Sequence, residues 1–248
     1  MTLVEAGPYL TRARMRQALS ESAIDALVAS IEDKAALASH HAVWTLFSDR
    51  PDRQRDFLWR EERPGHFYFL SSRIPEDRFG IFELDEPKVF APRLRSGDRL
   101  KFTLRVNATV ARRLSAGARS KAHDIVCNAL LKEGSTRESK SGDRRRLVYP
   151  IARDWLMTRG PQHGFSMVSS PAVDPEGWEP EWRDPFRVLG YRSVRIDRGK
   201  APVMRIGVLD LEGELVVEQP DIFTAAVTKG FGRAKAFGFG LMLLRRSR

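Results

Sequence analysis

The chain has 248 residues, 42% of them hydrophobic and 30% charged, which is ordinary for a globular protein and excludes a disordered or fibrous chain. A single cysteine, Cys127, excludes an internal disulfide and a thiolate zinc cluster, and no apolar run approaches the roughly 20 residues of a membrane helix. Because the net charge is +10 and the first residues lack the pattern of a signal peptide, we expect a cytoplasmic protein with a polyanionic partner.

Six segments of the first 95 residues have strand or helix patterns in the order β-α-β-β-α-β, which is typical of a ferredoxin-like domain. The expected elements are a strand at Tyr9–Met15, a helix at Lys34–Phe47, strands at Phe57–Arg60 and His66–Leu70, a helix beginning at Ile74–Asp77 and a closing strand at Val89–Phe90.

The turn Ser96-Gly97-Asp98 predicts a domain boundary, and the clearest strand of the chain follows it. Leu100, Phe102, Leu104 and Val106 alternate with polar residues, two of which are cationic. This alternation predicts a half-buried strand with a polar, cationic outer face.

The remaining residues predict a second domain with the same element order and a longer first helical region. We expect helical character at Arg119–Lys132, a mobile polar segment at Gly134–Arg146, a helix from Pro150 to Gly160 and an irregular loop at 171–186. Strands are expected at Val188–Asp197 and Val203–Leu211, followed by a turn at Glu212-Gly213 into Leu215–Val217. A helix capped by Asp221 and ending near Lys229, and a last strand at Leu241–Leu244, complete the predicted domain. The predicted fold class is α+β, with two tandem ferredoxin-like (RRM-like) domains at residues 1–95 and 96–248.

Positive charge is concentrated in the second half of the chain. Lys101–Gly160 contains 14 lysines and arginines against five acids, and Lys229–Arg248 contains six against none. This segregation favours a binding surface for a polyanion over a merely solubilising surface.

A glycine-rich segment begins at Gly230 and holds four glycines within eleven residues. Its spacing matches neither the phosphate loop of nucleotide-binding proteins nor the dinucleotide fingerprint. Two interpretations stay open: a turn that packs closely on a neighbour, and a cradle for the RNA backbone. In the cradle, main-chain N–H groups of Gly230, Gly232 and Gly238 would contact phosphates together with Arg233 or Lys235.

His40 and His41 are candidates for a general acid or base, because imidazole titrates near neutral pH. On a helix, His40 shares a face with Val43, Trp44 and Phe47. The structural alternatives are a half-buried histidine at the edge of a core and a solvated neighbour. The other histidines lack ligand spacing, so we expect no metal site and no cofactor.

Four separated segments together resemble one family of RNA-processing enzymes. Gly230–Leu244 resembles the glycine-rich pattern G-x-G-x-A-K-x-x-G-x-G-L-L of this family. His40–Asp49 resembles its helix with an active-site histidine, and Asp56–Arg60 resembles the strand that follows this helix. Leu104–Ala108 resembles an L-R-x-N-P segment. In these features the chain is similar to the CasE-type CRISPR repeat endoribonucleases of type I-E systems, within the RAMP superfamily.

This resemblance implies a specific activity. Such enzymes bind the hairpin of a repeat RNA and cut precursor CRISPR RNA once at the 3′ base of that hairpin, by attack of a ribose 2′-OH without metal. The products carry a 2′,3′-cyclic (or 3′) phosphate and a 5′-OH, and the enzyme remains as a subunit of a multi-protein surveillance complex (Cascade). By position His40 is the catalytic histidine, with His41 as the alternative if the register differs by one. Lys235 falls on the lysine of the loop.

Two residues depart from the family pattern. Leu37 stands where familiar members have a tyrosine, three residues before the histidine, so the resemblance leaves the catalytic partner of His40 unidentified. Ala108 stands where the family has a proline, which we expect to affect only a turn.

The resemblance also places a basic segment of the second domain in the groove of the RNA hairpin. The expected RNA contacts are Arg105, Arg119, Lys121, Lys140, Arg144, Arg145 and Arg146, in addition to the glycine-rich segment. A solvated run of charge is the structural alternative.

Two other functions stay open. A non-catalytic subunit that only holds an RNA hairpin would fit the leucine at position 37. A DNA-binding protein would fit the charge but none of the motifs.

Overall fold

The computed structural model describes residues 7–20, 24, 38–47, 54–112, 121–136, 139–168, 170–171, 182–183, 186–198 and 201–247. The chain divides into two compact units. The first unit comprises Met1–Pro92, Val194–Ile206 and Ala234–Leu241, and the second comprises Arg93–Ser193, Gly207–Arg233 and Met242–Arg248. Part of the glycine-rich segment therefore belongs to the same compact unit as the N-terminal residues.

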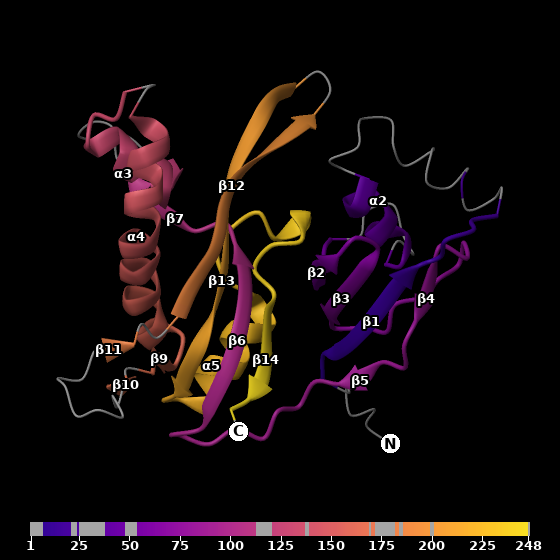
Figure 1. Ribbon diagram of the computed structural model, residues 1–248. Helices are drawn as coiled ribbons and strands as arrows, with labels where there is room; N and C mark the ends of the chain where they lie inside the picture. Colours follow the sequence, from indigo (N-terminus) through magenta and orange to yellow (C-terminus); the bar gives the residue numbers. More distant parts are fainter. Residues whose placement is uncertain are drawn as a thin grey trace, which may run out of the picture. The chain divides into compact units, whose positions relative to one another are not determined.

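An antiparallel sheet forms the body of the first unit, with the strand order β2-β3-β1-β4 and with β5 also paired to β1 (Figure 1). Its elements are β1 (Tyr9–Met15), α2 (Ala38–Thr45), β2 (Phe57–Arg63), β3 (His66–Ser71), β4 (Phe82–Leu84) and β5 (Lys88–Val89). The predicted strand Tyr9–Met15 is confirmed, and so is the pair of strands β2 and β3.

Helix α2 and the turn after it cover one face of this sheet through the apolar side chains of Val43 in the helix and Phe47 in the turn. Val43 and Phe47 are 0% and 1% exposed, and they pack into a cluster that includes Phe57 and Phe69. The rings of Phe47 and Phe57 stack with their centroids 4.0 Å apart. Because each such side chain contributes roughly 1.5–3 kcal/mol on full burial, this cluster fixes α2, and with it the histidines that α2 carries.

The helix predicted to begin at Ile74–Asp77 is not formed. The carboxylate of Asp77 instead accepts hydrogen bonds from the main-chain N–H groups of Ile81 (3.0 Å) and Phe82 (3.1 Å), at the entrance to β4. A short acidic side chain stabilises a turn in the same way that it caps a helix, so the local sequence fits both conformations.

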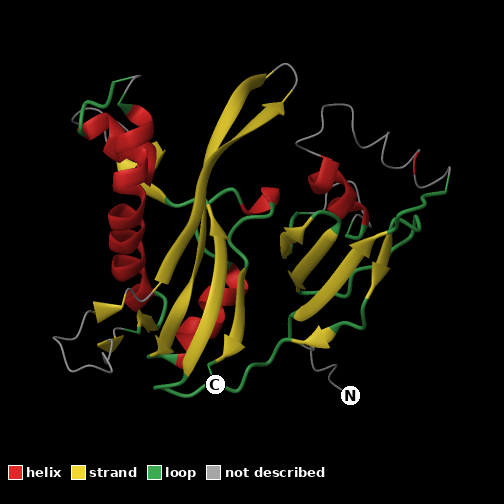
Figure 2. Ribbon diagram, in the orientation of Figure 1, coloured by secondary structure: helices red, strands yellow, loops and turns green. Residues whose placement is uncertain are grey.

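A second antiparallel sheet has the strand order β12-β13-β6-β14, with β9 also paired to β13 (Figure 2). Its strands are β6 (Arg99–Val106), β9 (Phe165–Met167), β12 (Phe186–Arg198), β13 (Ala201–Val217) and β14 (Met242–Arg246). The predicted alternation in β6 is confirmed, since Leu100, Phe102, Leu104 and Val106 are all buried.

Four further helical elements and two short strand pairs complete the described residues. They are the β7–β8 pair (Thr109–Arg112 and Lys121–Asp124), α3 (Ile125–Lys132), α4 (Lys140–Gln162), the β10–β11 pair (Ser170–Pro171 and Trp182–Arg183), α5 (Pro220–Lys229) and the 3₁₀ helix η2 (Lys235–Phe237).

Helix α4 begins ten residues before the predicted start at Pro150, so most of the segment expected to be mobile is helical. Thr136 and Ser139 exchange hydrogen bonds between their side chains and main-chain N–H groups, at 3.1 and 3.2 Å. Ser139 also donates to Asp143 in the first turn, at 2.6 Å. These hydrogen bonds stabilise the turn that leads into α4, and Pro150 is tolerated inside the helix at the cost of one main-chain hydrogen bond.

Two smaller expectations for the second unit are also wrong. Strand β13 runs through the predicted turn at Glu212-Gly213, because Glu212 pairs with Thr103 and Gly213 with Phe102 in a continuous ladder on β6. Helix α5 starts with Pro220 after the cap position Gln219, so Asp221 lies in its first turn rather than at its cap.

Candidate functional site

Two side chains of the first unit bind one main-chain oxygen that lies far from both of them in the sequence. The imidazole Nδ1 of His40, on α2, lies 2.7 Å from the carbonyl oxygen of Ala236 in the glycine-rich segment. The indole N–H of Trp59, on β2, donates to the same oxygen at 3.0 Å. The ring of Phe237 lies beside that of His40, with 5.4 Å between their centroids. This arrangement holds the imidazole between the sheet and the C-terminal segment.

The hydrogen-bond partner of Nδ1 determines which nitrogen of the His40 ring carries the hydrogen. A carbonyl oxygen can only accept a hydrogen bond, so Nδ1 must carry the hydrogen that it shares with Ala236. In the neutral ring, Nε2 then has a free lone pair. The geometry therefore prepares Nε2 to take a proton from a substrate.

The surroundings favour the neutral form of His40. Burial lowers the pKa of His40 below its ordinary value, and the charges of His41 and Arg55 lower it further, while the hydrogen bond to Ala236 opposes them. Burial also lowers the pKa of His41. At neutral pH both rings are therefore neutral, as a proton acceptor requires.

The glycine-rich segment approaches β2 so closely that one of its glycines has no room for a side chain. Gly238 has a φ of +81°, and a Cβ atom there would lie 2.9 Å from the Trp59 ring. Trp59 itself is 4% exposed. Gly238 thus allows the short helix η2 to lie against Trp59, which places the Ala236 carbonyl opposite His40.

The start of the glycine-rich segment packs against β6 within the second unit. The N–H of Arg233 donates to the carbonyl of Asn107 at 3.1 Å, and the side-chain amide of Asn107 donates to the carbonyl of Gly207 at 2.7 Å. A Cβ atom on Gly232 would lie 2.5 Å from Val106. Close packing therefore explains Gly232, and the positive φ of Gly230 ends helix α5.

The cations of the segment differ in their surroundings. Arg233 has an exposed side chain, and Lys235 is half-buried at the first position of η2. Both residues lie within three positions of Ala236, whose carbonyl binds His40.

The other predicted RNA contacts lie on several elements. Arg105 on β6 donates to Asp210 at 2.6 Å, and Asp210 also accepts from Arg192. Lys121 at the start of β8 and Lys140 at the start of α4 are exposed, whereas Arg119 and the departure at Leu37 lie outside the described residues.

Three consecutive arginines occupy the first turns of α4 with different partners. The guanidinium of Arg144 lies over the ring of Tyr191, 5.8 Å from its centroid. Arg145 lines the same groove between α4 and β12. Arg146 pairs with Glu133 and Asp143 instead, and the hydrogen bond to Glu133 and the charge of that residue raise the pKa of Arg146.

Trp59 and Tyr191 contribute to these sites, and sequence reasoning assigned neither of them a functional role. Trp59 lies in an apolar run typical of a buried strand, and no local pattern links it to a residue 177 positions later. Tyr191 lies in a strand of mixed polarity. Only the partial burial of Tyr191 would have indicated a functional role, and that burial depends on the tertiary structure.

Within the described ranges, His, Cys, Asp and Glu side chains form no group of three or more that could hold a metal ion. None of the described helices combines the length and apolar character needed to cross a membrane.

The fold and the site define an α+β protein in which a glycine-rich C-terminal segment holds a histidine of an N-terminal helix. A family profile described as "CRISPR associated protein" matches residues 9–246, and the chain belongs to this family. The resemblance predicted from the four motifs is thereby confirmed.

One curated relative is the CRISPR-associated endoribonuclease Cse3 of Thermus thermophilus, 27% identical over 164 residues. The alignment spans 66% of this chain and 63% of that protein, which is less than two thirds of the relative's length.

Solved structures of Cse3 share the fold. One, bound to a 19-nucleotide RNA, has a TM-score of 0.62 at 23% identity and covers 96% of this chain and 100% of its own. Another, of Thermus thermophilus Cse3 bound to an RNA representing a pre-cleavage complex, has the same TM-score and identity over 96% and 99% of the two chains. The predicted class of two tandem ferredoxin-like domains is confirmed by this likeness.

Proposed function

We propose that this protein is a metal-independent endoribonuclease that binds the hairpin of a CRISPR repeat and cleaves precursor CRISPR RNA at the 3′ base of that hairpin. The observation that carries the proposal is the proton assignment on His40, whose Nε2 is free to accept a proton because Nδ1 donates to Ala236. The relative from Thermus thermophilus, named an endoribonuclease, agrees with this class of activity.

In the proposed reaction, Nε2 of His40 removes the proton of a ribose 2′-OH. The 2′ oxygen attacks the adjacent phosphorus, and the bond from phosphorus to the 5′ oxygen of the next nucleotide breaks. The leaving oxygen takes a proton from water or from the protonated imidazole, which leaves a 2′,3′-cyclic phosphate and a 5′-OH. A cation of the glycine-rich segment, Lys235 or Arg233, would stabilise the charge that develops on the phosphate.

RNA binding is proposed for the basic residues of the second half of the chain, because cations neutralise phosphates and the RNA duplex is recognised mainly through its shape and backbone. Gly230, Gly232 and Gly238 would act by shaping the segment that presents its N–H groups. The proposed cationic contacts are Arg105, Arg119, Lys121, Lys140, Arg144, Arg145, Arg146, Arg233 and Lys235.

We also propose that the protein acts in the cytoplasm and keeps its RNA product as a subunit of a surveillance complex. A structure described as a CRISPR RNA-guided surveillance complex, pre-nicking, contains a chain with this fold, with a TM-score of 0.52 at 20% identity.

The test is cleavage of the repeat RNA with EDTA present. We expect one cut at the 3′ base of the hairpin, with a 2′,3′-cyclic phosphate at the new end and no loss of rate in the chelator. Loss of cleavage in EDTA, or full activity of both His40→Ala and His41→Ala, would contradict the mechanism.

The second candidate is a subunit that holds the hairpin without cutting it. The leucine at position 37, where familiar members have a tyrosine, favours this function. Tight binding of the repeat by the wild-type protein, with the RNA left intact, would support it.

A further inference from the structure

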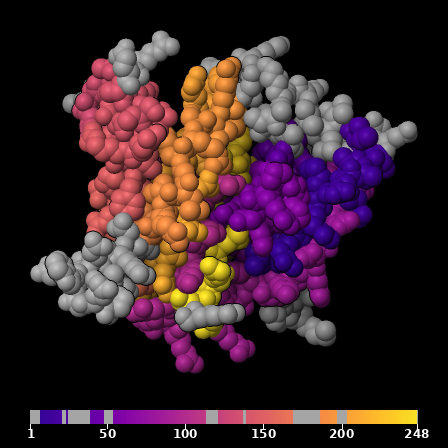
Figure 3. Space-filling view, in the orientation of Figure 1, coloured from indigo at the N-terminus to yellow at the C-terminus, as the bar shows by residue number. Residues whose placement is uncertain are grey.

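A groove of about 570 Å³ lies between helix α4 and strand β12 in the second unit. In the space-filling view, the atoms of α4 lie directly beside those of β12 (Figure 3). Helix α4 contributes Ser141, Arg144, Arg145, Val148 and Tyr149, and β12 contributes Phe186, Arg187, Val188, Gly190 and Tyr191. Three of these ten residues are arginines and three are aromatic, and none is an acid.

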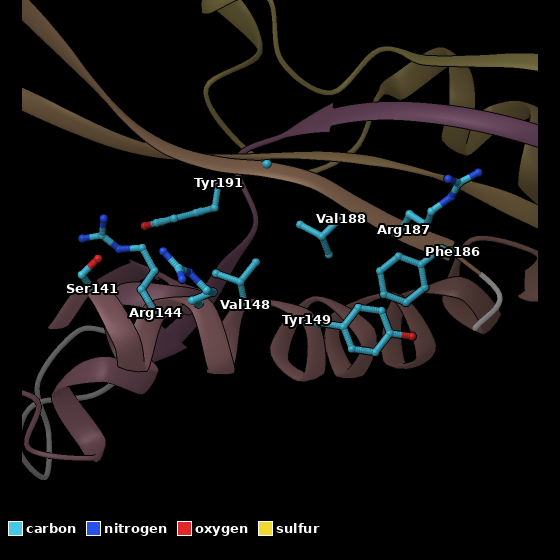
Figure 4. A pocket seen from close by; sticks show the side chains of 10 residues that line it. Ser141, Arg144, Val148, Tyr149, Phe186, Arg187, Val188 and Tyr191 are labelled. Atoms are coloured by element: carbon cyan, nitrogen blue, oxygen red, sulfur yellow. The ribbon is translucent and has the colours of Figure 1, made fainter. Parts of the chain in front are cut away.

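At one end of the groove, a cationic guanidinium group lies over an aromatic ring. Arg144 lies over the ring of Tyr191, and Ser141 and Tyr191 lie close to it in Figure 4. The Tyr191 hydroxyl donates to Asp124 at 2.9 Å and lies 3.4 Å from Sγ of Cys127. Burial raises the pKa of the Tyr191 phenol, so the ring stays neutral beneath the guanidinium. This end of the groove thus places the cationic group of Arg144 against the aromatic ring of Tyr191.

The middle of the groove is apolar. Tyr149 and Phe186 stack with their centroids 5.1 Å apart and an angle of 11° between the rings. Figure 4 shows Val188 and Phe186 directed from β12 toward α4, with Val148 on the helix between Val188 and Tyr191 in this view. Such a floor suits a flat, largely apolar group such as a nucleobase.

Gly190 lies inside strand β12, and the packing of the described residues does not require a glycine at this position. A Cβ atom there would meet nothing within 4 Å, in contrast to Gly207, where it would lie 2.0 Å from Asp124. By strand alternation Gly190 shares the face of Phe186 and Val188, so its missing side chain leaves space in the groove. A glycine at such a position leaves room for a ligand to approach the main chain closely.

We propose that this groove binds an unpaired nucleotide of single-stranded RNA, with its phosphate on Arg144 and Arg145 and its base on the apolar floor beside Gly190. The inference rests on the proposed function for the class of polymer. It refines the RNA contact proposed above for Arg144 and Arg145: the phosphate that they bind belongs to an unpaired nucleotide that flanks the hairpin, because a stacked duplex hides the base faces that this floor would contact. Arg187 of the groove pairs with Glu212, whereas a wholly apolar peptide would bring no anionic group to Arg144 and Arg145.

The test uses the full-length protein and an unstructured, 5′-labelled RNA hexamer that contains one 4-thiouridine. Fluorescence anisotropy measures its affinity, and cross-linking with mass spectrometry locates the base. We expect Gly190→Leu, which fills the groove, to weaken hexamer binding about tenfold, and Gly190→Ala to change it little. We expect Arg144→Ala and Arg145→Ala each to reduce the salt dependence by about 0.7 in log–log slope.

Arg153→Ala is the matched control, because Arg153 is an exposed arginine of the same helix that does not line the groove. We expect it to bind the hexamer within about twofold of wild type. Equal affinity in wild type, Gly190→Leu and Arg144→Ala, or cross-links only outside α4 and β12, would overturn the proposal. So would preferential binding of a peptide of alternating glutamate and phenylalanine at this groove.

The two proposals fail in different ways. If the groove proposal alone is wrong, wild type still cuts the hairpin while the hexamer binds without regard to Gly190. If the proposed function is wrong, wild type leaves the hairpin intact, whatever the hexamer does.

Discussion

His40 on helix α2 places its Nδ1 2.7 Å from the carbonyl oxygen of Ala236, 196 residues further along the chain. The contact joins the helix that carries the candidate catalytic histidine to the glycine-rich segment. In the proposed reaction it favours His40 over the adjacent His41, because the contact with Ala236 orients the ring of His40.

We expect His40→Ala to lower the single-turnover rate of hairpin cleavage by about 10²–10⁴-fold, the usual contribution of a general base. Hairpin affinity should stay within about twofold, since the ring is proposed to act on a proton rather than on the stem. Rates with saturating enzyme and a separate binding titration measure the two quantities.

His41→Ala is the matched control in the same helix, and we expect it to keep most of the activity. A larger loss in His41→Ala than in His40→Ala would place the base at position 41 and would remove the role proposed for the Ala236 carbonyl.

Trp59→Phe should slow cleavage about tenfold with hairpin affinity unchanged. The substitution removes the indole N–H that donates to Ala236, so one of the two bonds that fix this carbonyl opposite His40 is lost. Phe69→Leu serves as the control, because Phe69 is a buried residue of the same sheet. We expect it to lower the melting temperature but not the rate, whereas equal rate losses would make Trp59 merely structural.

The cleavage rate should fall at acidic pH, with the midpoint of this fall below pH 6.5, the ordinary pKa of histidine. Only neutral His40 can accept the proton, and burial lowers its pKa, so the rate falls as the pH drops through the folded value. The free energy of unfolding should fall over the same range, because the unfolded chain binds this proton at higher pH than the folded chain does. Single-turnover rates and chemical denaturation from pH 4.5 to 8 check both statements.

His41→Asn should move the midpoint of that fall in rate upward. The positive charge of protonated His41 is one of the causes that lower the pKa of His40, and the 5.4 Å between the two ring centroids makes this interaction direct. A midpoint that stays in place, or moves downward, would show that the fall in rate reports another group.

Gly238→Ala should destabilise the first unit by about 2–4 kcal/mol, because it combines a positive φ with a clash on Trp59. Gly80→Ala is the matched control, since Gly80 has a φ of +68° and open space around it. It should cost only about 1 kcal/mol of backbone strain. Equal losses in thermal unfolding would mean that close packing on Trp59 contributes nothing.

Local patterns were sufficient for much of the fold. The alternation in β6 predicted its buried face, and the apolar residues around Phe57 and Phe69 predicted the β2–β3 pair. They were insufficient where one short motif fits two conformations. The side chain of Asp77 stabilises a turn where a helix was expected, and α4 starts ten residues early, after a turn in which Thr136 and Ser139 exchange hydrogen bonds.

The candidate site was predictable in its residue types but not in its geometry. The family resemblance predicts His40 and Lys235 as site residues and the run of positive charge predicts Arg144, and these assignments stay predictions. The roles of Trp59 and Tyr191 were not predicted, because an indole or phenol in a strand has the same local pattern whether it only packs or also holds another group.

By itself, the sequence determined the family, the α+β class and the residue types of the site, because side-chain chemistry and short-range periodicity are local properties. Only the tertiary structure decided which nitrogen of His40 carries the proton, and it did so through a carbonyl that lies 196 residues away. It likewise placed Arg144 over Tyr191 and left open the space at Gly190. Such contacts arise from the packing of distant elements on one another, and no local pattern contains that information.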